Sequence, residues 1–182
     1  NDAEVAKTAE AVIQQLKIKP KATDDSPKIS TMSIADAAAK AVAMQGDVAL
    51  GKQVFKRADC AACHTVSKDE VQKGPFLGNI AKTYKRSELA DAVLEPSKTI
   101  AQGFATNVIV TADGKTYTGF VSAELSESVT LRNAKGKEIM INKVSIEERA
   151  TSKVSVMPEG VLKEYTLHEL ASLLDYLQSL AP

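Results

Sequence analysis

The sequence is poor in the residues that most often bind metals: it has two cysteines and two histidines among its 182 residues. A structural zinc site needs four such ligands, and His168 lies far along the chain from Cys60, Cys63 and His64, so zinc is not expected. The 23 Lys and Arg balance the 23 Asp and Glu, which leaves no basic surface for nucleic acid. No run approaches the roughly 18 apolar residues of a membrane-spanning helix, so no transmembrane segment is predicted.

The few cysteines and histidines are concentrated in one motif, Cys60-Ala61-Ala62-Cys63-His64. The pattern Cys-x-x-Cys-His is the attachment site of a c-type haem. Two thiols three positions apart can reach both vinyl groups of one porphyrin as thioethers, and the adjacent imidazole then faces the iron. A redox-active dithiol is the main alternative, but that motif belongs beside a βαβ pattern, and none is predicted here. The motif therefore predicts one covalently attached haem c, with both cysteines used for its attachment.

The first residue is Asn, and no positively charged and then apolar leader is present. We therefore expect a mature product whose export signal has been removed. Haem attachment through thioethers takes place outside the cytoplasm in bacteria, so the periplasm or another exported compartment is the expected location.

Residues 1–45 are interpreted as accessory helices and a linker. Helical spacing predicts a helix over Asp2–Lys17, and a Pro- and Asp-rich linker over Pro20–Pro27 follows it. A second helix is expected over Ser33–Gln45, capped by Ser33. This region is either packed on the core or held by a partner, and its candidate ligands are Met32 and Met44.

Residues 46–182 are expected to form the main domain. A helix with Val48, Gly51, Val54 and Phe55 on its inner face should lead into the cysteine motif. A loop over Gly74–Ile80 follows, and then a helix over Glu88–Glu95 that is capped by Ser87 and stopped by Pro96. The closing helix is capped by Thr166 with Glu169 three residues later, a capping box. Its buried stripe is predicted to be Leu170, Leu173, Leu174, Leu177 and Leu180.

Between these helices, residues 104–150 change to the period of β-strands. Asn107–Thr111 and Thr116–Val121 are rich in β-branched and aromatic residues, and an Asp-Gly turn separates them. Ser128–Arg132 and Lys137–Ile141 form a second predicted pair, and Val144–Glu147 is a candidate fifth strand. A small antiparallel β-module is therefore predicted inside a helical protein.

Three residues compete to be the second axial ligand of the iron. Met157 lies in a loop directly before Pro158, where a rigid backbone could direct its thioether, or else it fills a gap in the core. Met140 lies within a predicted strand, where packing is the better explanation. His168 shares a helix face with Ser172, Asp175 and Ser179, so we expect it to point to water.

The order of these features resembles a class I cytochrome c: a helix, Cys60–His64, Gly74-Pro75-x-Leu77, Met157-Pro158 and a closing helix. The string Ser155–Val161, together with Gly114-x-x-Tyr117-x-Gly119-x-Val121, is similar to the haem-binding domain described from Planctomycetes and Verrucomicrobia. The resemblance covers Gly46 to Pro182. It implies a mainly α class I core around a haem with an inserted antiparallel β-module, α+β overall. In that family the domain often ends a large dehydrogenase-like polypeptide. Here we expect a departure from that arrangement, with the chain acting as a stand-alone carrier or a subunit.

The resemblance also assigns roles to residues. Cys60 and Cys63 would bond the porphyrin, and His64 and Met157 would be the axial ligands of the iron. The carbonyl of Pro75 would accept a hydrogen bond from Nδ1 of His64. Other residues expected to contact the haem are Phe55 and Leu77, as apolar cover, and Tyr84 and Arg86, at the propionates. The alternative for Arg86 is a solvated basic face shared with Lys82 and Lys85.

A six-coordinate iron suits electron transfer rather than catalysis, so we expect a single-electron carrier that meets its redox partner proteins transiently. A haem sensor or peroxidase-like module with a displaceable Met157 is the alternative. Peroxidase chemistry would need a distal acid or base, for which Glu159 and Glu164 are the nearest candidates. A third possibility is a subunit that docks onto a larger oxidoreductase complex.

Overall fold

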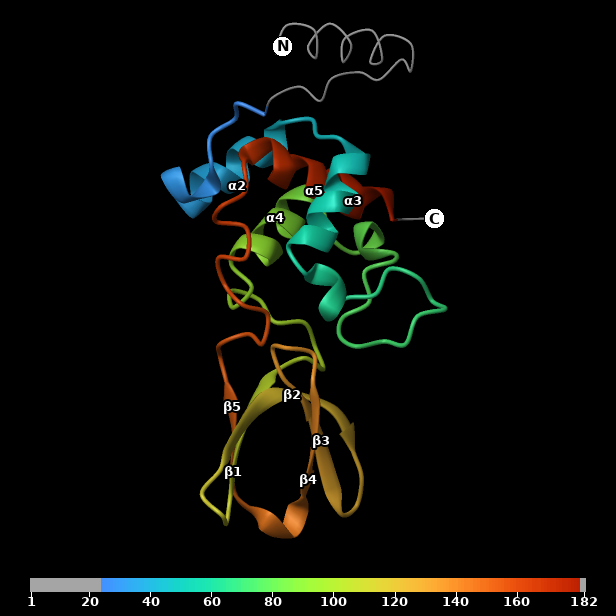
Figure 1. Ribbon diagram of the computed structural model, residues 1–182, viewed down its shortest axis with the longest axis vertical. Coiled ribbons are helices and arrows are strands. Elements are labelled where there is room, and N and C mark those ends of the chain that lie inside the picture. Colours follow the sequence, from blue (N-terminus) through green and yellow to red (C-terminus); the bar gives the residue numbers. More distant parts are fainter. Residues whose placement is uncertain (1–23, 181–182) are drawn as a thin grey trace, which may run out of the picture.

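The computed structural model describes residues 24–180. The predicted helix Asp2–Lys17 and the start of the linker lie outside this range. Figure 1 shows a helical body joined to a separate β-sheet. The helices are α2 (Ile34–Ala43), α3 (Val48–Arg57), α4 (Arg86–Leu94) and α5 (Leu167–Ser179). The strands are β1 (Thr106–Thr111), β2 (Thr116–Glu124), β3 (Ser128–Arg132), β4 (Glu138–Asn142) and β5 (Ile146–Ser152). The fold is therefore α+β, as predicted.

Side-chain caps fix where most of these helices begin. Ser33 accepts a hydrogen bond from the amide of Asp36 at the start of α2, and Asp47 accepts one from Leu50 at the start of α3. The predicted capping box of α5 is present. The predicted start of α4 was wrong: the helix begins at Arg86, because the Glu88 carboxylate accepts the amide of Lys85 at 2.7 Å.

The helical body is held together mainly by the crossing of α3 and α5. At Gly51 a Cβ atom would lie 1.9 Å from the carbonyl oxygen of Ser172, so only glycine allows the two helices to approach this closely. One turn later the rings of Phe55 and Tyr176 lie 5.6 Å apart. Val48, expected on the inner face of α3, is instead 47% exposed.

The described part of the N-terminal region packs on this body. Ala37 and Ala41 of α2 are fully buried in the helical core, which they share with α4 and α5. The amide of Ile29 donates to the carbonyl of Tyr165 at 2.9 Å. Of the two alternatives for this region, residues 24–45 therefore follow the first, packing on the core.

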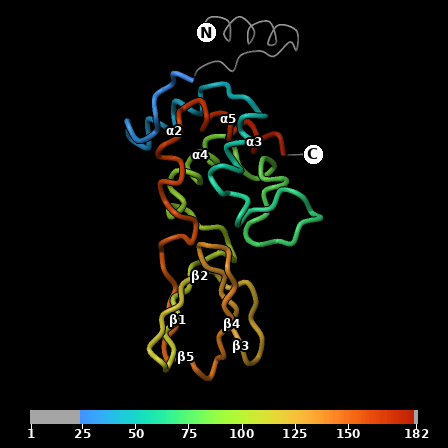
Figure 2. Tube along the Cα trace, viewed as in Figure 1, coloured from blue at the N-terminus to red at the C-terminus, as the bar shows by residue number. Residues whose placement is uncertain are grey.

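The five strands form one antiparallel sheet in the order β4-β3-β2-β1-β5. Its two edges are β4 and β5, which in a flat sheet would be about 19 Å apart, or four strand spacings. Only the 3-10 turn Lys143–Ser145 joins them, and the four residue steps from Asn142 to Ile146 span at most about 14 Å. The sheet must therefore be curled, as Figures 1 and 2 show.

β2 is the strand at which the sheet turns. Its first half pairs with β1, and from Phe120 onward it pairs with β3, with a register shift between Val121 and Ala123. At Gly119, between the two halves, a Cβ atom would lie 2.4 Å from the carbonyl oxygen of Arg132. The fifth strand begins later than predicted, because the turn over Lys143–Ser145 occupies the start of the predicted segment.

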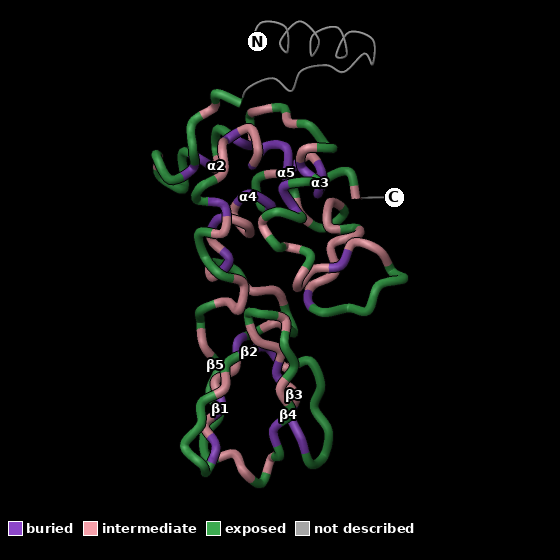
Figure 3. The backbone as a smooth tube through the Cα atoms, in the orientation of Figure 1, coloured by how far each residue is buried: buried purple, intermediate pink, exposed green. Residues whose placement is uncertain are grey.

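The sheet has a core of its own, formed by Ile109, Val129, Leu131 and Ile141. Figure 3 shows buried residues in the helical body and in the sheet, with mostly half-buried or exposed chain between them. The sheet and the helices therefore have separate hydrophobic cores.

Candidate haem-binding site

The cysteine motif directly follows α3, and a left-handed residue sets its direction. Asp59 has a φ of 57°, which breaks the helix after Ala58. Cys60–Ala62 then form a 3-10 turn, and the amide of His64 donates to the carbonyl of Cys60 at 2.9 Å. Both cysteines are free thiols and half-buried. The turn therefore holds the two thiols and the imidazole on one short, ordered segment.

The loop over Gly74–Gly78 wraps closely around this segment. The amide of Leu77 donates to the carbonyl of Thr65 at 2.9 Å. At Gly74 a Cβ atom would lie 2.6 Å from the carbonyl oxygen of Cys63, and at Gly78 one would lie 2.4 Å from that of Val66. The missing side chains of both glycines thus let the loop approach the backbone that follows the cysteines.

This close approach brings the carbonyl oxygen of Pro75 to 2.9 Å from Nδ1 of His64. A carbonyl oxygen can only accept a hydrogen bond, so Nδ1 carries the proton and Nε2 keeps its lone pair free. A hydrogen bond of this kind fixes the tautomer and ring orientation of a histidine that ligates a metal. The contact predicted between His64 and Pro75 is present.

Burial keeps the motif uncharged. It lowers the pKa of His64, and the hydrogen bond to Pro75 opposes this only in part, so the imidazole stays neutral and able to ligate. Burial also raises the pKa of Cys60 to about 11 and raises the pKa of Cys63. A redox-active dithiol has the opposite property, a lowered thiol pKa. The thiols therefore do not fit the redox alternative.

Met157 lies in a half-buried loop that is tied to the end of α4. The amide of Ser155 donates to Oγ of Ser97 at 3.2 Å, and Oγ of Ser155 accepts the amide of Met157 at 3.1 Å. Two hydrogen bonds thus connect Ser97 to the methionine. By contrast, Met140 in β4 is 71% exposed.

The other candidates differ in their exposure. His168 is half-buried, and its amide donates to Oγ of Ser26. The helix face that it shares is only partly exposed to water: Ser179 is exposed, but Ser172 is fully buried and accepts the amide of Asp47 at 3.0 Å. Glu159 and Glu164 are exposed, and Glu164 pairs with Lys28 at 3.1 Å.

The donor set fits a c-type haem. Two neutral thiols and an oriented imidazole lie on one turn. Directly after His64, the buried Oγ1 atom of Thr65 has no hydrogen-bond partner within the described part of the chain. Among residues 24–180, no group of three or more His, Cys, Asp or Glu is arranged to hold a bare metal ion. The two thiols and the imidazole are the groups that would hold a covalently attached porphyrin and its iron.

Comparison with known families agrees with this geometry: the family model described as Cytochrome c matches residues 48–181. The chain belongs to the cytochrome c family. It is accordingly a haem-binding electron-transfer protein whose family carries covalently bound haem c. No curated protein matches the chain at a significant level. Within the described residues of this cytochrome, no helix is both long and apolar enough to cross a membrane.

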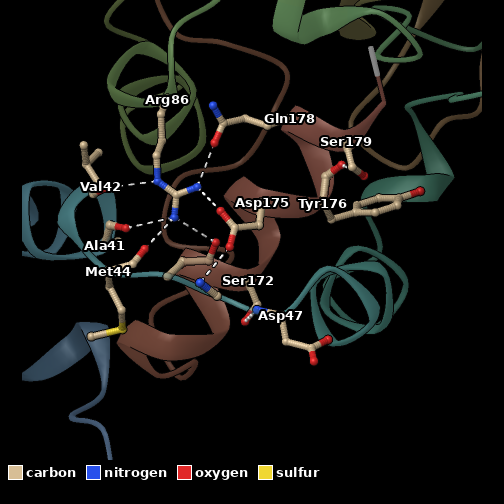
Figure 4. Close-up of polar contacts among 12 residues, drawn as sticks. Ala41, Val42, Met44, Asp47, Arg86, Ser172, Asp175, Tyr176, Gln178 and Ser179 are labelled. Atoms are coloured by element: carbon tan, nitrogen blue, oxygen red, sulfur yellow. Dashed lines mark hydrogen bonds and ion pairs between the residues drawn. The ribbon is translucent and has the colours of Figure 1, made fainter. Parts of the chain in front are cut away.

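The assignment of Arg86 to the haem propionates was wrong. Figure 4 shows its guanidinium directed into the junction of α2, α4 and α5. Nε donates to the carbonyl of Val42, and Nη1 donates to Asp175 and Gln178. Nη2 binds the carbonyls of Ala41, Met44 and Ala171 at 2.8–3.2 Å. With all three nitrogens engaged, Arg86 has no donor left for a propionate, and it is no part of a solvated face.

The remaining predicted contacts lie on the helical core. Phe55 is buried against Tyr176, and Leu77 and Tyr84 are half-buried and packed against the same cluster. Cys60 of the motif is packed against the same cluster in this cytochrome.

Sequence reasoning missed the contribution of the β-module to this site. The β3–β4 turn lies at the end of the sheet that faces the helical body (Figure 1). Gly136 in this turn has a φ of +72°, and a Cβ atom there would lie 3.1 Å from the carbonyl oxygen of Ala62. The same turn also borders an open cavity of about 400 Å³, which lies between the turn and the loop before Met157. Only a local signal for the turn, Lys135-Gly136, was visible in the sequence.

Proposed function

We propose that this cytochrome is a monohaem single-electron carrier with His64 and Met157 as the axial ligands of its iron. The observation that carries the proposal is the 2.9 Å contact between Nδ1 of His64 and the carbonyl of Pro75. It leaves the lone pair of Nε2 on a neutral imidazole pointing in a fixed direction, available to bind iron. Cys60 and Cys63 on the same turn would hold the porphyrin.

The haem supplies reversible exchange of one electron between ferric and ferrous iron. The protein fixes the donor atoms and limits access of water. His64 is oriented by Pro75, and Met157 is restrained through Ser155. Ligation by Met and His raises the reduction potential relative to other haem sites. A restrained pair of ligands changes little between oxidation states, which favours electron transfer over binding of a substrate at the iron.

The ligand assignment is tested by absorption spectra of the oxidised protein. The wild type should have the weak far-red band that arises from charge transfer between sulfur and iron, and Met157→Ala should lose it. Met140→Ala is the matched control, because it removes a methionine that is 71% exposed, and its band should be unchanged. A wild type without this band would overturn Met157 as the ligand.

The number of haems is tested separately by mass spectrometry of natively produced protein. The expected mass exceeds that of the polypeptide by one haem, and Cys60→Ala with Cys63→Ala should abolish the increase. A mass equal to that of the bare chain would overturn the proposal as a whole.

We also propose that the protein acts in an exported compartment, since bacteria attach haem c outside the cytoplasm. The β-module ahead of Met157 supports membership of the type found in Planctomycetes and Verrucomicrobia. Its partners would be redox proteins that bind briefly through small interfaces. The sensor or peroxidase alternative has less support, because Glu159 and Glu164 are exposed to solvent.

A further inference from the structure

Arg132, the last residue of β3, is held next to the cysteine motif by the β-module. Its Nη1 lies 3.4 Å from the carbonyl oxygen of Gly136, the residue that closely approaches Ala62. The backbone of Arg132 packs closely against β2. A Cβ atom at Gly119 would lie 2.4 Å from the carbonyl oxygen of Arg132, so only glycine fits at that position. The guanidinium is therefore positioned beside the haem-attachment segment by a part of the chain about 70 residues away in sequence.

The side chain of Arg132 is 12% exposed, so its charge is only weakly screened by solvent. It forms an ion pair with Glu138 at 2.5 Å, and the side chain of Glu138 is 50% exposed. The hydrogen bond of Nη1 goes to Gly136, the residue of the β3–β4 turn that approaches the carbonyl oxygen of Ala62. The buried, positive end of this ion pair is thus attached to the turn that approaches the motif.

Arg132 also differs from Arg86 in how its donors are used. Every nitrogen of Arg86 has a protein partner, whereas the buried Nε of Arg132 has none among residues 24–180. The ion pair with Glu138 and the bond to Gly136 therefore do not satisfy this guanidinium, which keeps a free donor in a buried position.

We propose that Arg132 is a tuning residue of the haem, a cation supplied by the β-module that raises the reduction potential of the iron. The inference rests on the proposed function, because it requires a haem on Cys60 and Cys63. Oxidised iron carries one more positive charge than reduced iron. A nearby, poorly screened cation therefore disfavours the oxidised state more than the reduced one. Glu138 partly cancels this effect, so the pair sets the potential together.

The test is the midpoint potential of the purified holoprotein, measured by spectroscopic titration. Arg132→Gln should lower the potential, and Glu138→Gln should raise it by exposing the charge of Arg132. Arg132→Lys keeps the charge and should shift the potential less than Arg132→Gln. Lys115→Gln and Asp113→Asn are the matched controls, because this exposed ion pair lies in the β1–β2 turn at the opposite end of the sheet. Neither control should change the potential.

Equal potentials in Arg132→Gln and Lys115→Gln would overturn the inference, as would a shift of the same sign in Arg132→Gln and Glu138→Gln. If Arg132→Gln fails to fold, the direction of the Glu138→Gln shift still decides. Haem mass and the far-red band are recorded for each variant. A wild type that lacks the far-red band, while Arg132→Gln and Glu138→Gln still shift the potential in opposite directions, overturns only the ligand assignment. A wild type without haem overturns both proposals.

Discussion

Arg86 joins three helices through a single side chain. It binds the carbonyl groups at the end of α2, the Asp175 carboxylate of α5 and the Gln178 side chain, and both partners of the ion pair are largely buried. Asp175 also accepts the amide of Gly46 at 2.7 Å, which ties the start of α3 to the same point. Removal of the guanidinium would leave several buried carbonyl groups without this donor and the Asp175 carboxylate without its ionic partner.

We expect Arg86→Met to lower the free energy of unfolding by about 3–5 kcal/mol, the usual cost of breaking a buried ion pair from one side. Denaturant titration measures this loss. The far-red absorption of the folded fraction should be unchanged, since the donors of Arg86 are all used within the helical body. A large change in potential with little loss of stability would contradict this structural role.

The residues of the site that could be predicted are those whose roles depend on local sequence. Cys60, Cys63 and His64 form one turn, and Pro75 follows in the next loop. The roles of Arg86 and Arg132 could not be predicted, because their contacts depend on how distant elements pack. Arg86 reaches residues 44 and 89 positions away, and Arg132 meets the motif through a turn of the β-module.

Among the helices, the crossing of α3 and α5 depends most on one small residue. A Cβ atom at Gly51 would lie within 2.7 Å of Ser172 and Tyr176 atoms, two of them backbone. Backbone cannot move aside as a flexible side chain can, so any larger residue must push the helices apart.

We expect Gly51→Ala to destabilise the protein by about 2–3 kcal/mol, the range for overpacking a closely packed interface, even though alanine favours helix. Gln53→Ala, at an exposed position of the same helix, controls for helix propensity and should change stability by less than about 0.5 kcal/mol. Thermal and denaturant unfolding measure both. Equal stability of the two variants would show that the helices do not meet at Gly51.

The β3–β4 turn can be tested in a similar way. Gly136 and Gly114 both have φ near +75°, at +72° and +77°, but only Gly136 has neighbouring atoms where a Cβ would lie. Each change to alanine should cost about 1–2 kcal/mol for the left-handed backbone. Gly136→Ala should cost more, because it also disturbs the contact with Ala62. Identical losses, measured by denaturant unfolding, would mean that the turn does not bear on the cysteine motif.

The first hairpin of the sheet could be predicted because its turn residues and alternation are local. The start of β5 and the start of α4 could not. A 3-10 turn occupies the predicted start of β5, and a cap from Glu88 displaces the predicted Ser87.

At the scale of the whole molecule, the helices and the sheet have separate cores. The chain enters and leaves the sheet at neighbouring positions, because Thr106 at the start of β1 pairs with Ser152 at the end of β5. A short linker could therefore join the chain on either side of the sheet without strain.

We expect a variant with residues 107–151 replaced by a short Gly-Ser linker to retain a folded helical body and covalently bound haem. Less surface would be exposed on unfolding, so the denaturant m-value should fall. Mass spectrometry and denaturant titration measure the two outcomes. An unfolded variant without haem would show that the helical body depends on the sheet for its stability.

The link from Ser97 through Ser155 to Met157 lies just where the chain returns from the sheet. It anchors the segment after β5 to the segment after α4. If Met157 ligates the iron as proposed, these two hydrogen bonds would hold its backbone in place where the chain leaves the sheet. A displacement of β5 would then be resisted at Ser155 before it changed the position of the thioether.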